Sequence, residues 1–149
     1  MDRRTFLAKS AAALLGLPAS GLLSRLAAQE GNPAAGMIDR NTDAAINGSL
    51  QWLSRQQHND GSFGTNQYQG NVAITSLAGL AFMAGGHQPG RGLYGEHVTR
   101  AVRYILRLEE PGMPGFINAP RSAFHGPMYG HGFATLFLAE VYEIGRAHV

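Results

Sequence analysis

The chain has 149 residues, of which 44% are hydrophobic and 15% are charged. This balance excludes a disordered or collagen-like chain and predicts about one folded domain with a core. The formal charge of +2 comes from the first thirty residues, and the neutral remainder has no Lys/Arg cluster that would indicate a nucleic-acid or anionic-membrane surface. Because the chain has no cysteine, disulfides, thiolate nucleophiles and Cys-ligated zinc sites are excluded.

The first 28 residues have the pattern of a twin-arginine signal peptide. Arg3 and Arg4 are followed by Thr-Phe-Leu and by a short apolar run, Ala11 to Leu23, which Gly and Pro interrupt. Such a run is too short to span a membrane, and the arginine pair is the address that the export machinery reads. We expect cleavage after Ala28 and a periplasmic or extracellular protein with no stable membrane span. An ordinary secretory signal or a cytosolic amphipathic helix is the alternative.

Residues 29–37 are rich in Gly, Pro and Ala without periodicity, which predicts a linker before a folded part that begins near residue 38. Ile46, Leu50 and Leu53 then recur at positions i, i+4 and i+7, opposite polar side chains. This spacing predicts a first amphipathic helix, roughly from Asp39 to Gln57.

The next predicted helix, Asn71 to Met83, is apolar or small on every side, so we expect it to need neighbours on several sides. The same alternation then returns. Residues 96–110 are amphipathic, with Val98, Val102 and Ile105 on one face and arginines on the other, and His131 to Tyr142 are again almost wholly apolar.

Trp52 and Tyr104 hold the same place in the two amphipathic helices, and a spacing near fifty residues with one hairpin per unit is typical of a helical repeat array. The sequence therefore predicts an all-α fold of two helical hairpins, with outer amphipathic helices and inner apolar ones.

The stretch from Gly48 to Gly64 contains Trp52, Gln57, Gly61 and Phe63, at a spacing that resembles the QW motif of squalene-hopene cyclases and of the wider prenyltransferase and squalene oxidase repeat family. Phe63 stands where that motif has Trp, and a weaker second copy follows Tyr104, with Glu109 in the Gln position and Gly115-Phe116 after it. The resemblance implies that residues 38–143 are the first two helix pairs of an α/α toroid in a secreted bacterial member of the family.

Helix starts leave unpaired N–H groups, and the Gln57 amide is expected to satisfy one at the next inner helix. We expect the Phe63 ring to stack over that amide while Gly61 turns the chain sharply. The motif is therefore interpreted as a structural staple between repeats and not as a catalytic site.

Three residues are candidates for lining a cavity: His131, Glu140 and Tyr129. For His131, a backbone hydrogen bond at the helix entry is favoured over metal binding, because a third ligand is missing. Glu140 is expected to pair with an arginine of the neighbouring helix, or else to be a cavity acid with a raised pKa. The aromatic rings can be explained by core packing or by contacts to a carbocation. No metal site and no cofactor are predicted.

The acidic Asp-x-Asp-Asp motif that squalene-hopene cyclases use to protonate an alkene is absent. Residues 144–149, Ile-Gly-Arg-Ala-His-Val, are what a common sequencing adaptor encodes, so we expect the helix pattern to break after Glu143 and the natural chain to continue through further repeats. Two functions remain open. The chain belongs either to an enzyme of the terpene cyclase or prenyltransferase type, acting on an isoprenoid or other apolar ligand, or to a non-catalytic toroid that binds a peptide, lipid or glycan. A carbohydrate-active toroid is a weaker third alternative.

Overall fold

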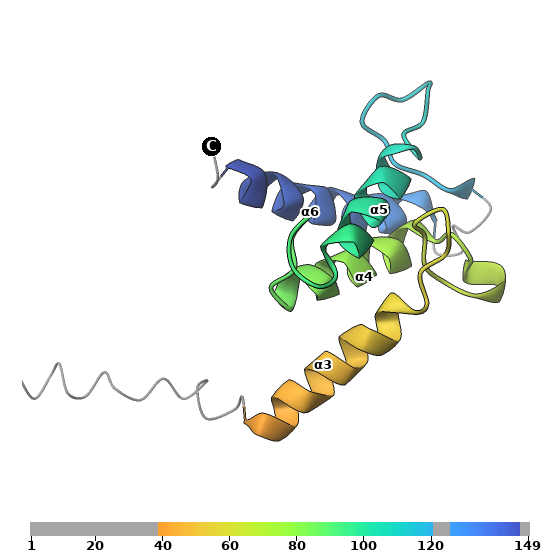
Figure 1. Ribbon diagram of the computed structural model, residues 1–149. Coiled ribbons are helices and arrows are strands. Elements are labelled where there is room, and N and C mark those ends of the chain that lie inside the picture. The colour runs from red at the N-terminus through yellow and green to blue at the C-terminus, as the bar shows by residue number, and fades with distance from the viewer. Residues whose placement is uncertain (1–38, 121–125, 147–149) are drawn as a thin grey trace, which may run out of the picture. The chain divides into compact units, whose positions relative to one another are not determined.

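The computed structural model describes residues 39–120 and 126–146 (Figure 1). These residues form four α-helices and one short 3-10 helix, and within them only isolated β-bridges occur in place of strands. The helices are α3 (Arg40–Ser54), η1 (Asn66–Tyr68), α4 (Val72–Ala84), α5 (Gly95–Leu106) and α6 (Pro127–Arg146). The described part of the chain is therefore all-α, which confirms the predicted class.

The predicted signal peptide at 1–28, with Arg3 and Arg4, and the linker at 29–37 lie outside the described residues. At the start of the described part, Asp39 accepts hydrogen bonds from the backbone N–H and the hydroxyl of Thr42 at 2.8 and 3.0 Å, which caps α3. From Asp43 onward the residues belong to one compact unit. Among the described helices, none has the length and apolar character needed to cross a membrane.

Helices α4 and α6 pack side by side and run in the same direction (Figure 1). Near their starts, a Cβ atom on Gly130 would lie 3.1 Å from the Cβ of Val72. Two turns later, a Cβ atom on Gly79 would lie 2.5 Å from Cε2 of the Phe137 ring. The second contact lies seven residues after the first along both helices, so α4 and α6 run parallel, and glycine at 79 makes room for the ring.

Helix α5 packs antiparallel against α4. At one end, the His97 ring stacks on Phe82 with centroids 5.6 Å apart, and at the other end the hydroxyl of Tyr104 donates to the backbone oxygen of Gly70 at 2.7 Å. Val98, Ala101 and Ile105 of α5 are fully buried. Val102, which the amphipathic pattern placed on the buried face, is only half-buried, and Ala101 takes its place in the core.

Helix α3 contributes less to the core than the sequence predicted. Leu50 is buried against Gly85 at the end of α4, and Leu53 is half-buried. Ile46 is 45% exposed, so its assignment to the buried face was wrong. The reason is that α3 meets the rest of the described unit at its C-terminal end, so one turn back from Leu50 the apolar stripe has no neighbour among the described residues (Figure 1).

The two apolar helices, α4 and α6, have neighbours on only part of their circumference. Leu77 of α4 is 43% exposed and Leu136 of α6 is 49% exposed. The predicted end of the last helix was also wrong, because α6 continues past Glu143 to Arg146 without a break. The described unit therefore carries an exposed apolar surface beside a compact core.

Candidate functional site

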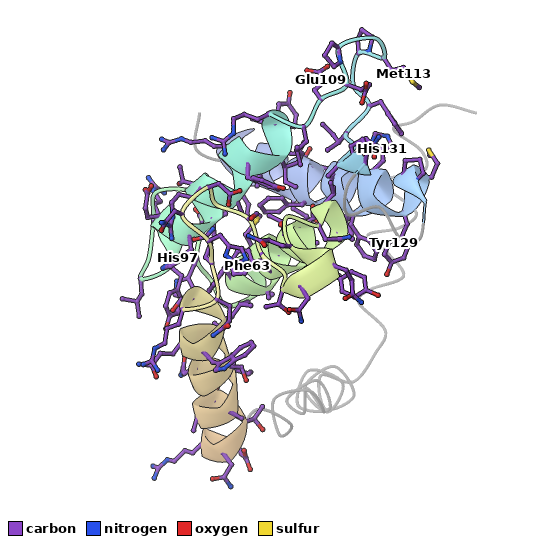
Figure 2. All side chains as sticks on the ribbon, turned by 90° about the vertical axis from the view of Figure 1, so that its right-hand side faces the viewer. Phe63, His97, Glu109, Met113, Tyr129 and His131 are labelled. Carbon is purple, nitrogen blue, oxygen red and sulfur yellow. The ribbon has the colours of Figure 1, made fainter. Side chains whose placement is uncertain are left out.

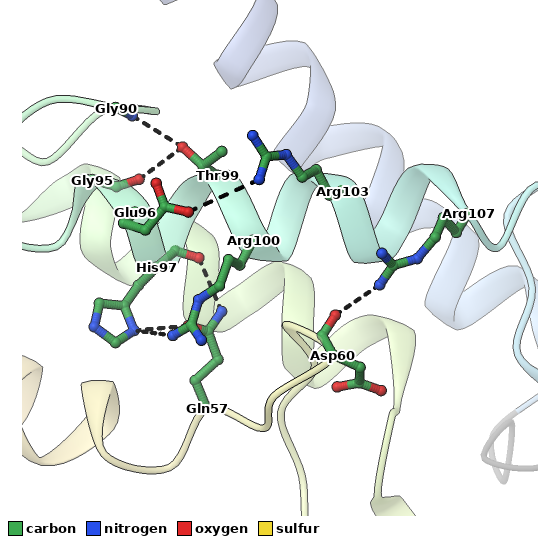
Figure 3. A network of polar contacts seen from close by, with 10 residues as sticks. All are labelled: Gln57, Asp60, Gly90, Gly95, Glu96, His97, Thr99, Arg100, Arg103 and Arg107. Carbon is green, nitrogen blue, oxygen red and sulfur yellow. Dashed lines mark hydrogen bonds and ion pairs between the residues drawn. The ribbon is translucent and has the colours of Figure 1, made fainter.

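Gln57 joins the turn after α3 to the first turns of α5 (Figure 3). Its amide nitrogen donates to the backbone oxygens of Gly61 and His97, at 3.0 and 2.9 Å. Because both amide hydrogens are used on carbonyl groups, the side-chain oxygen must be the acceptor that faces α5. That oxygen accepts from the Arg100 guanidinium and lies 2.7 Å from Nδ1 of His97. Gln57 thus makes four polar contacts, three of them to α5.

This geometry corrects the expected partner of Gln57. The sequence placed the amide at the start of the next inner helix, α4, as an acceptor for a free N–H group. In the structure α4 is capped by Asn71, whose side chain accepts from the backbone N–H of Ile74 at 3.1 Å. Gln57 instead donates to a carbonyl of the next outer helix. The contact therefore links the turn after α3 to α5, while α4 is capped by the residue directly before it.

His97 is part of the same cluster. Since Oε1 of Gln57 is an acceptor, the neutral His97 ring carries its hydrogen on Nδ1, and the 3.2 Å approach of Arg100 Nη2 to this nitrogen is then not a hydrogen bond. Burial lowers the pKa of His97, and the charge of Arg100 lowers it further, against the opposite effect of Glu96. The cluster therefore favours a neutral ring.

Phe63 and Gly61 fix the turn that follows Gln57. Phe63 is 1% exposed and its ring lies 6.3 Å from that of Phe82, so it belongs to the hydrophobic core. Its backbone N–H donates to the hydroxyl of Thr75 in α4, at 3.0 Å. Gly61 has φ of +93°, and a Cβ atom there would lie 2.8 Å from the carbonyl carbon of Arg100. Only glycine fits where the turn meets α5.

The second copy of the motif has the same layout with different chemistry. The side chain of Glu109 accepts from the backbone N–H of Gly115 at 2.7 Å, where Gln57 donates to the oxygen of Gly61. Ile117 is buried, and its N–H donates to Nδ1 of His131 in α6 at 3.2 Å. Ile117 therefore takes the place of Phe63, and the assignment of Phe116 to that place was wrong. The two extra residues lie between Glu109 and Gly115, and Ile117 follows Gly115 by two residues, as Phe63 follows Gly61.

His131 and Tyr129 leave α6 on different sides. His131 points toward the loop that carries Glu109 and Met113, and Tyr129 points away from it (Figure 2). His131 accepts the Ile117 hydrogen bond on Nδ1, as expected for a histidine at a helix entry. Tyr129 is exposed, and its ring meets that of Phe133 edge to face with centroids 5.1 Å apart. The two residues do not share one cavity.

An apolar groove of about 330 Å³ runs between α4 and α6. It is lined by Leu80, Met83 and Ala84 of α4 and by Leu136, Glu140 and Ile144 of α6. Leu80 and Ala84 lie nearly opposite Phe82 on α4, so the groove faces away from α5. Glu140 is exposed there and forms no ion pair with an arginine within the described residues, so the expected pairing was wrong. The groove thus has an apolar lining and one carboxylate.

Trp52 is 61% exposed on α3. Its counterpart Tyr104 is half-buried and holds the turn before α4 through its hydroxyl. The structure therefore separates Trp52 from the rest of the motif, and brings Gln57, Gly61 and Phe63 together with α5.

A second cavity, of about 440 Å³, includes Asp60, Ser62, Tyr104 and Leu108 in its lining. Its polar groups serve the local structure. Burial tends to raise the pKa of Asp60, but hydrogen bonds from the backbone N–H and hydroxyl of Ser62, at 2.9 and 2.7 Å, outweigh it and lower the pKa. The Arg107 guanidinium donates to the Asp60 backbone oxygen at 2.7 Å (Figure 3). This cavity is accordingly braced by structural contacts.

Within residues 39–120 and 126–146 no three His, Asp or Glu side chains are grouped closely enough to hold a metal ion. The sequence missed the roles of Arg100, His97 and Thr75. The amphipathic pattern assigned Arg100 to the solvent face. Arg100 follows His97 by three residues in the first turns of α5, so the two side chains share one face of the helix, and this spacing could have placed both beside Gln57.

The chain matches no family model, no curated protein and no solved structure. Functional inference therefore rests on the geometry of the groove and of the Gln57 cluster.

Proposed function

We propose that this chain is part of a squalene cyclase/prenyltransferase-like helical repeat protein that binds an isoprenoid or similar apolar chain in the groove between α4 and α6. The observation that carries the proposal is the groove itself, an open apolar channel between two parallel apolar helices. Its volume of about 330 Å³ falls at the lower end of the range of roughly 300–1,000 Å³ that is typical of small-molecule sites. Further parallel helices of an α/α toroid would extend it.

The chemistry of the lining suits a hydrocarbon with one polar end. Leu80, Met83 and Leu136 offer apolar surface, and methionine adapts its shape to irregular ligands. Contiguous exposed apolar surface of this kind marks interaction sites and ligand-binding grooves. Glu140 provides an acceptor for a terminal hydroxyl or ammonium group, and the Tyr129 and Phe133 rings further along α6 offer faces to an alkene or cation.

Binding is tested with a farnesyl alcohol that carries a dansyl fluorophore, titrated against the purified chain. Leu136→Lys places a charge in the groove and is expected to weaken binding by at least tenfold. Leu93→Lys is the matched control, because Leu93 is 80% exposed in the loop between α4 and α5 and its substitution should change nothing. Equal affinity of the two variants would refute the groove as the site.

Binding and catalysis are two candidate functions of the same groove. The absence of the Asp-x-Asp-Asp acid motif favours binding without turnover for this part of the chain. Incubation with squalene separates them, since cyclisation gives a product of unchanged mass but altered chromatographic retention. A toroid that binds a peptide or glycan would instead show no competition between that ligand and the farnesyl probe.

We also propose that the chain is exported by the twin-arginine route. Arg3, Arg4 and the apolar run after them support this, together with the neutral composition of the remaining chain.

A further inference from the structure

The first hairpin is α3 with α4, and the second hairpin is α5 with α6. Equivalent positions in the two hairpins can be matched through their hydrogen bonds. His58 N–H donates to the oxygen of Ser62, as Glu110 N–H donates to that of Phe116, at 2.9 and 2.8 Å. On the inner helices Thr75 and His131 receive the equivalent N–H groups. Positions 52 residues apart therefore correspond on the outer helices, and positions 56 residues apart correspond on the inner ones.

In the first hairpin, one face is covered by the second hairpin. Gln57 is bound by His97 and Arg100 of α5. Phe82 lies under the rings of Tyr94 and His97, with centroids 5.2 and 5.6 Å away. Gly79 lies under the ring of Phe137 of α6. The face is thus an interface between α-helical hairpins within one chain.

In the second hairpin, the equivalent face is a hollow of about 440 Å³. Glu109, Leu138 and Thr135 line it and correspond to Gln57, Phe82 and Gly79. Leu106 and Tyr142 form its rim and are 53% and 63% exposed. The face that α5 and α6 cover on the first hairpin is accordingly uncovered on the second within the described residues. We call this hollow the Glu109 face.

We propose that the Glu109 face is the docking surface for a further helical hairpin of the same type, whose first helix carries an arginine one to two turns from its N-terminus. The choice of partner rests on Glu109. A carboxylate only accepts hydrogen bonds, and one of its oxygens is already used by Gly115 N–H. The Gln57 amide both donates and accepts hydrogen bonds, whereas the Glu109 carboxylate can only accept them. The donors would therefore come from the incoming helix, at the position that Arg100 holds in α5.

A second copy of this chain is not the partner that fits. The positions of α3 that correspond to His97 and Arg100 are Ala45 and Gly48, which offer no side-chain donor. Helix α5 of another copy is already packed against its own α4. The proposal does not depend on what the groove between α4 and α6 binds.

The test uses the full chain and a synthetic peptide with the α5 sequence, residues 93–108. A hydrocarbon staple that joins positions 96 and 103 keeps the peptide helical. It replaces Glu96 and Arg103, whose exposed side chains form a surface ion pair at 4.0 Å in the chain. We expect saturable binding, followed by NMR, with shifts at Glu109, Ile117 and Leu138. Peptide Arg100→Ala should bind at least fivefold more weakly.

Charge reversal provides the decisive comparison. The Glu109→Arg variant of the chain should no longer bind the unmodified peptide and should bind a peptide that carries Arg100→Glu. The control variant Glu110→Arg, changed one residue away, should bind both peptides as the parent chain does. Three results would each overturn the proposal. They are the absence of binding at millimolar peptide, an affinity that does not change when Glu109 is substituted, and NMR shifts at Gln57 in place of Glu109. Glu109-dependent dimerisation of the chain alone would overturn the choice of partner.

Discussion

The ring of Phe137 lies directly over the backbone of Gly79, in the space where any other residue would have its Cβ atom. This contact sets the distance between the two parallel inner helices. Both residues belong to the buried part of the unit, and Phe137 is fully buried. A glycine in the middle of a helix is normally unfavourable, so its presence at 79 is explained by packing and not by helix propensity.

Gly79→Ala should therefore destabilise the fold by about 1–3 kcal/mol, because the added methyl group overlaps the ring. Gly132→Ala is the matched control, since Gly132 lies in α6 with open space around its Cβ position, and it should stabilise by about 0.5–1 kcal/mol. Urea unfolding followed by circular dichroism measures both. Equal effects of the two substitutions would show that the ring can move without cost.

Gln57→Ala should lower the free energy of unfolding by about 1–3 kcal/mol, because it leaves the Arg100 guanidinium and two carbonyl groups without their partner. Gln51→Ala, on the exposed side of α3, should change stability by less than about 0.5 kcal/mol. A loss of the same size in both variants would show that the polar cluster does not account for the effect.

Stability should depend on pH through His97. Its pKa in the folded chain is lowered, chiefly by burial, so the unfolded chain binds the proton more readily. The contribution of His97 is therefore complete above its ordinary pKa of about 6.5 and is lost as the pH falls from there toward the folded value. His97→Gln should flatten this slope below about pH 6.5. An NMR titration that gives His97 a pKa above 6.5 would contradict the assignment.

Tyr104→Phe should cost about 0.5–1.5 kcal/mol, because it removes the hydrogen bond to the oxygen of Gly70 that joins α5 to the turn before α4. Tyr94→Phe is the comparison, since Tyr94 contributes its ring to the cluster around Phe82 and its hydroxyl forms no hydrogen bond to another described residue. Urea denaturation midpoints measure both variants. An equal shift in Tyr104→Phe and Tyr94→Phe would show that the hydrogen bond to Gly70 does not account for the loss of stability.

Export should fail when Arg3 and Arg4 are both changed to Lys in a reporter fused after Gln29, because the machinery reads the arginine pair and not its charge. Lys9→Gln should leave export intact. Periplasmic reporter activity measures the result, and undiminished export of the double variant would favour an ordinary secretory signal.

The helices could be predicted because apolar residues recur with the helical period on the outer pair and fill every side of the inner pair. Periodicity also identified the buried Leu50, Val98 and Ile105. It failed for Ile46, because a buried stripe requires a neighbouring helix at that height, and the pattern of one helix does not state how far its neighbour extends.

The polar contacts were harder to predict. The spacing of Gln57, Gly61 and Phe63 indicated a staple, but the partner of Gln57 depends on where α5 begins, which is set by the loop after α4. Ile117 was missed as the counterpart of Phe63 because the aromatic residue of the second copy is its neighbour Phe116, although Ile117 follows Gly115 by two residues, as Phe63 follows Gly61.

The contact between Val72 and Gly130 also determines how successive hairpins are stacked. These two residues lie at the same height, 58 positions apart, whereas equivalent positions on the inner helices are 56 apart. Helix α6 is therefore displaced by two residues, about 3 Å, along the helix axis relative to α4. If the same axial displacement were repeated between further helix pairs, the helices would form a superhelix. A closed ring would require displacements in the opposite direction elsewhere.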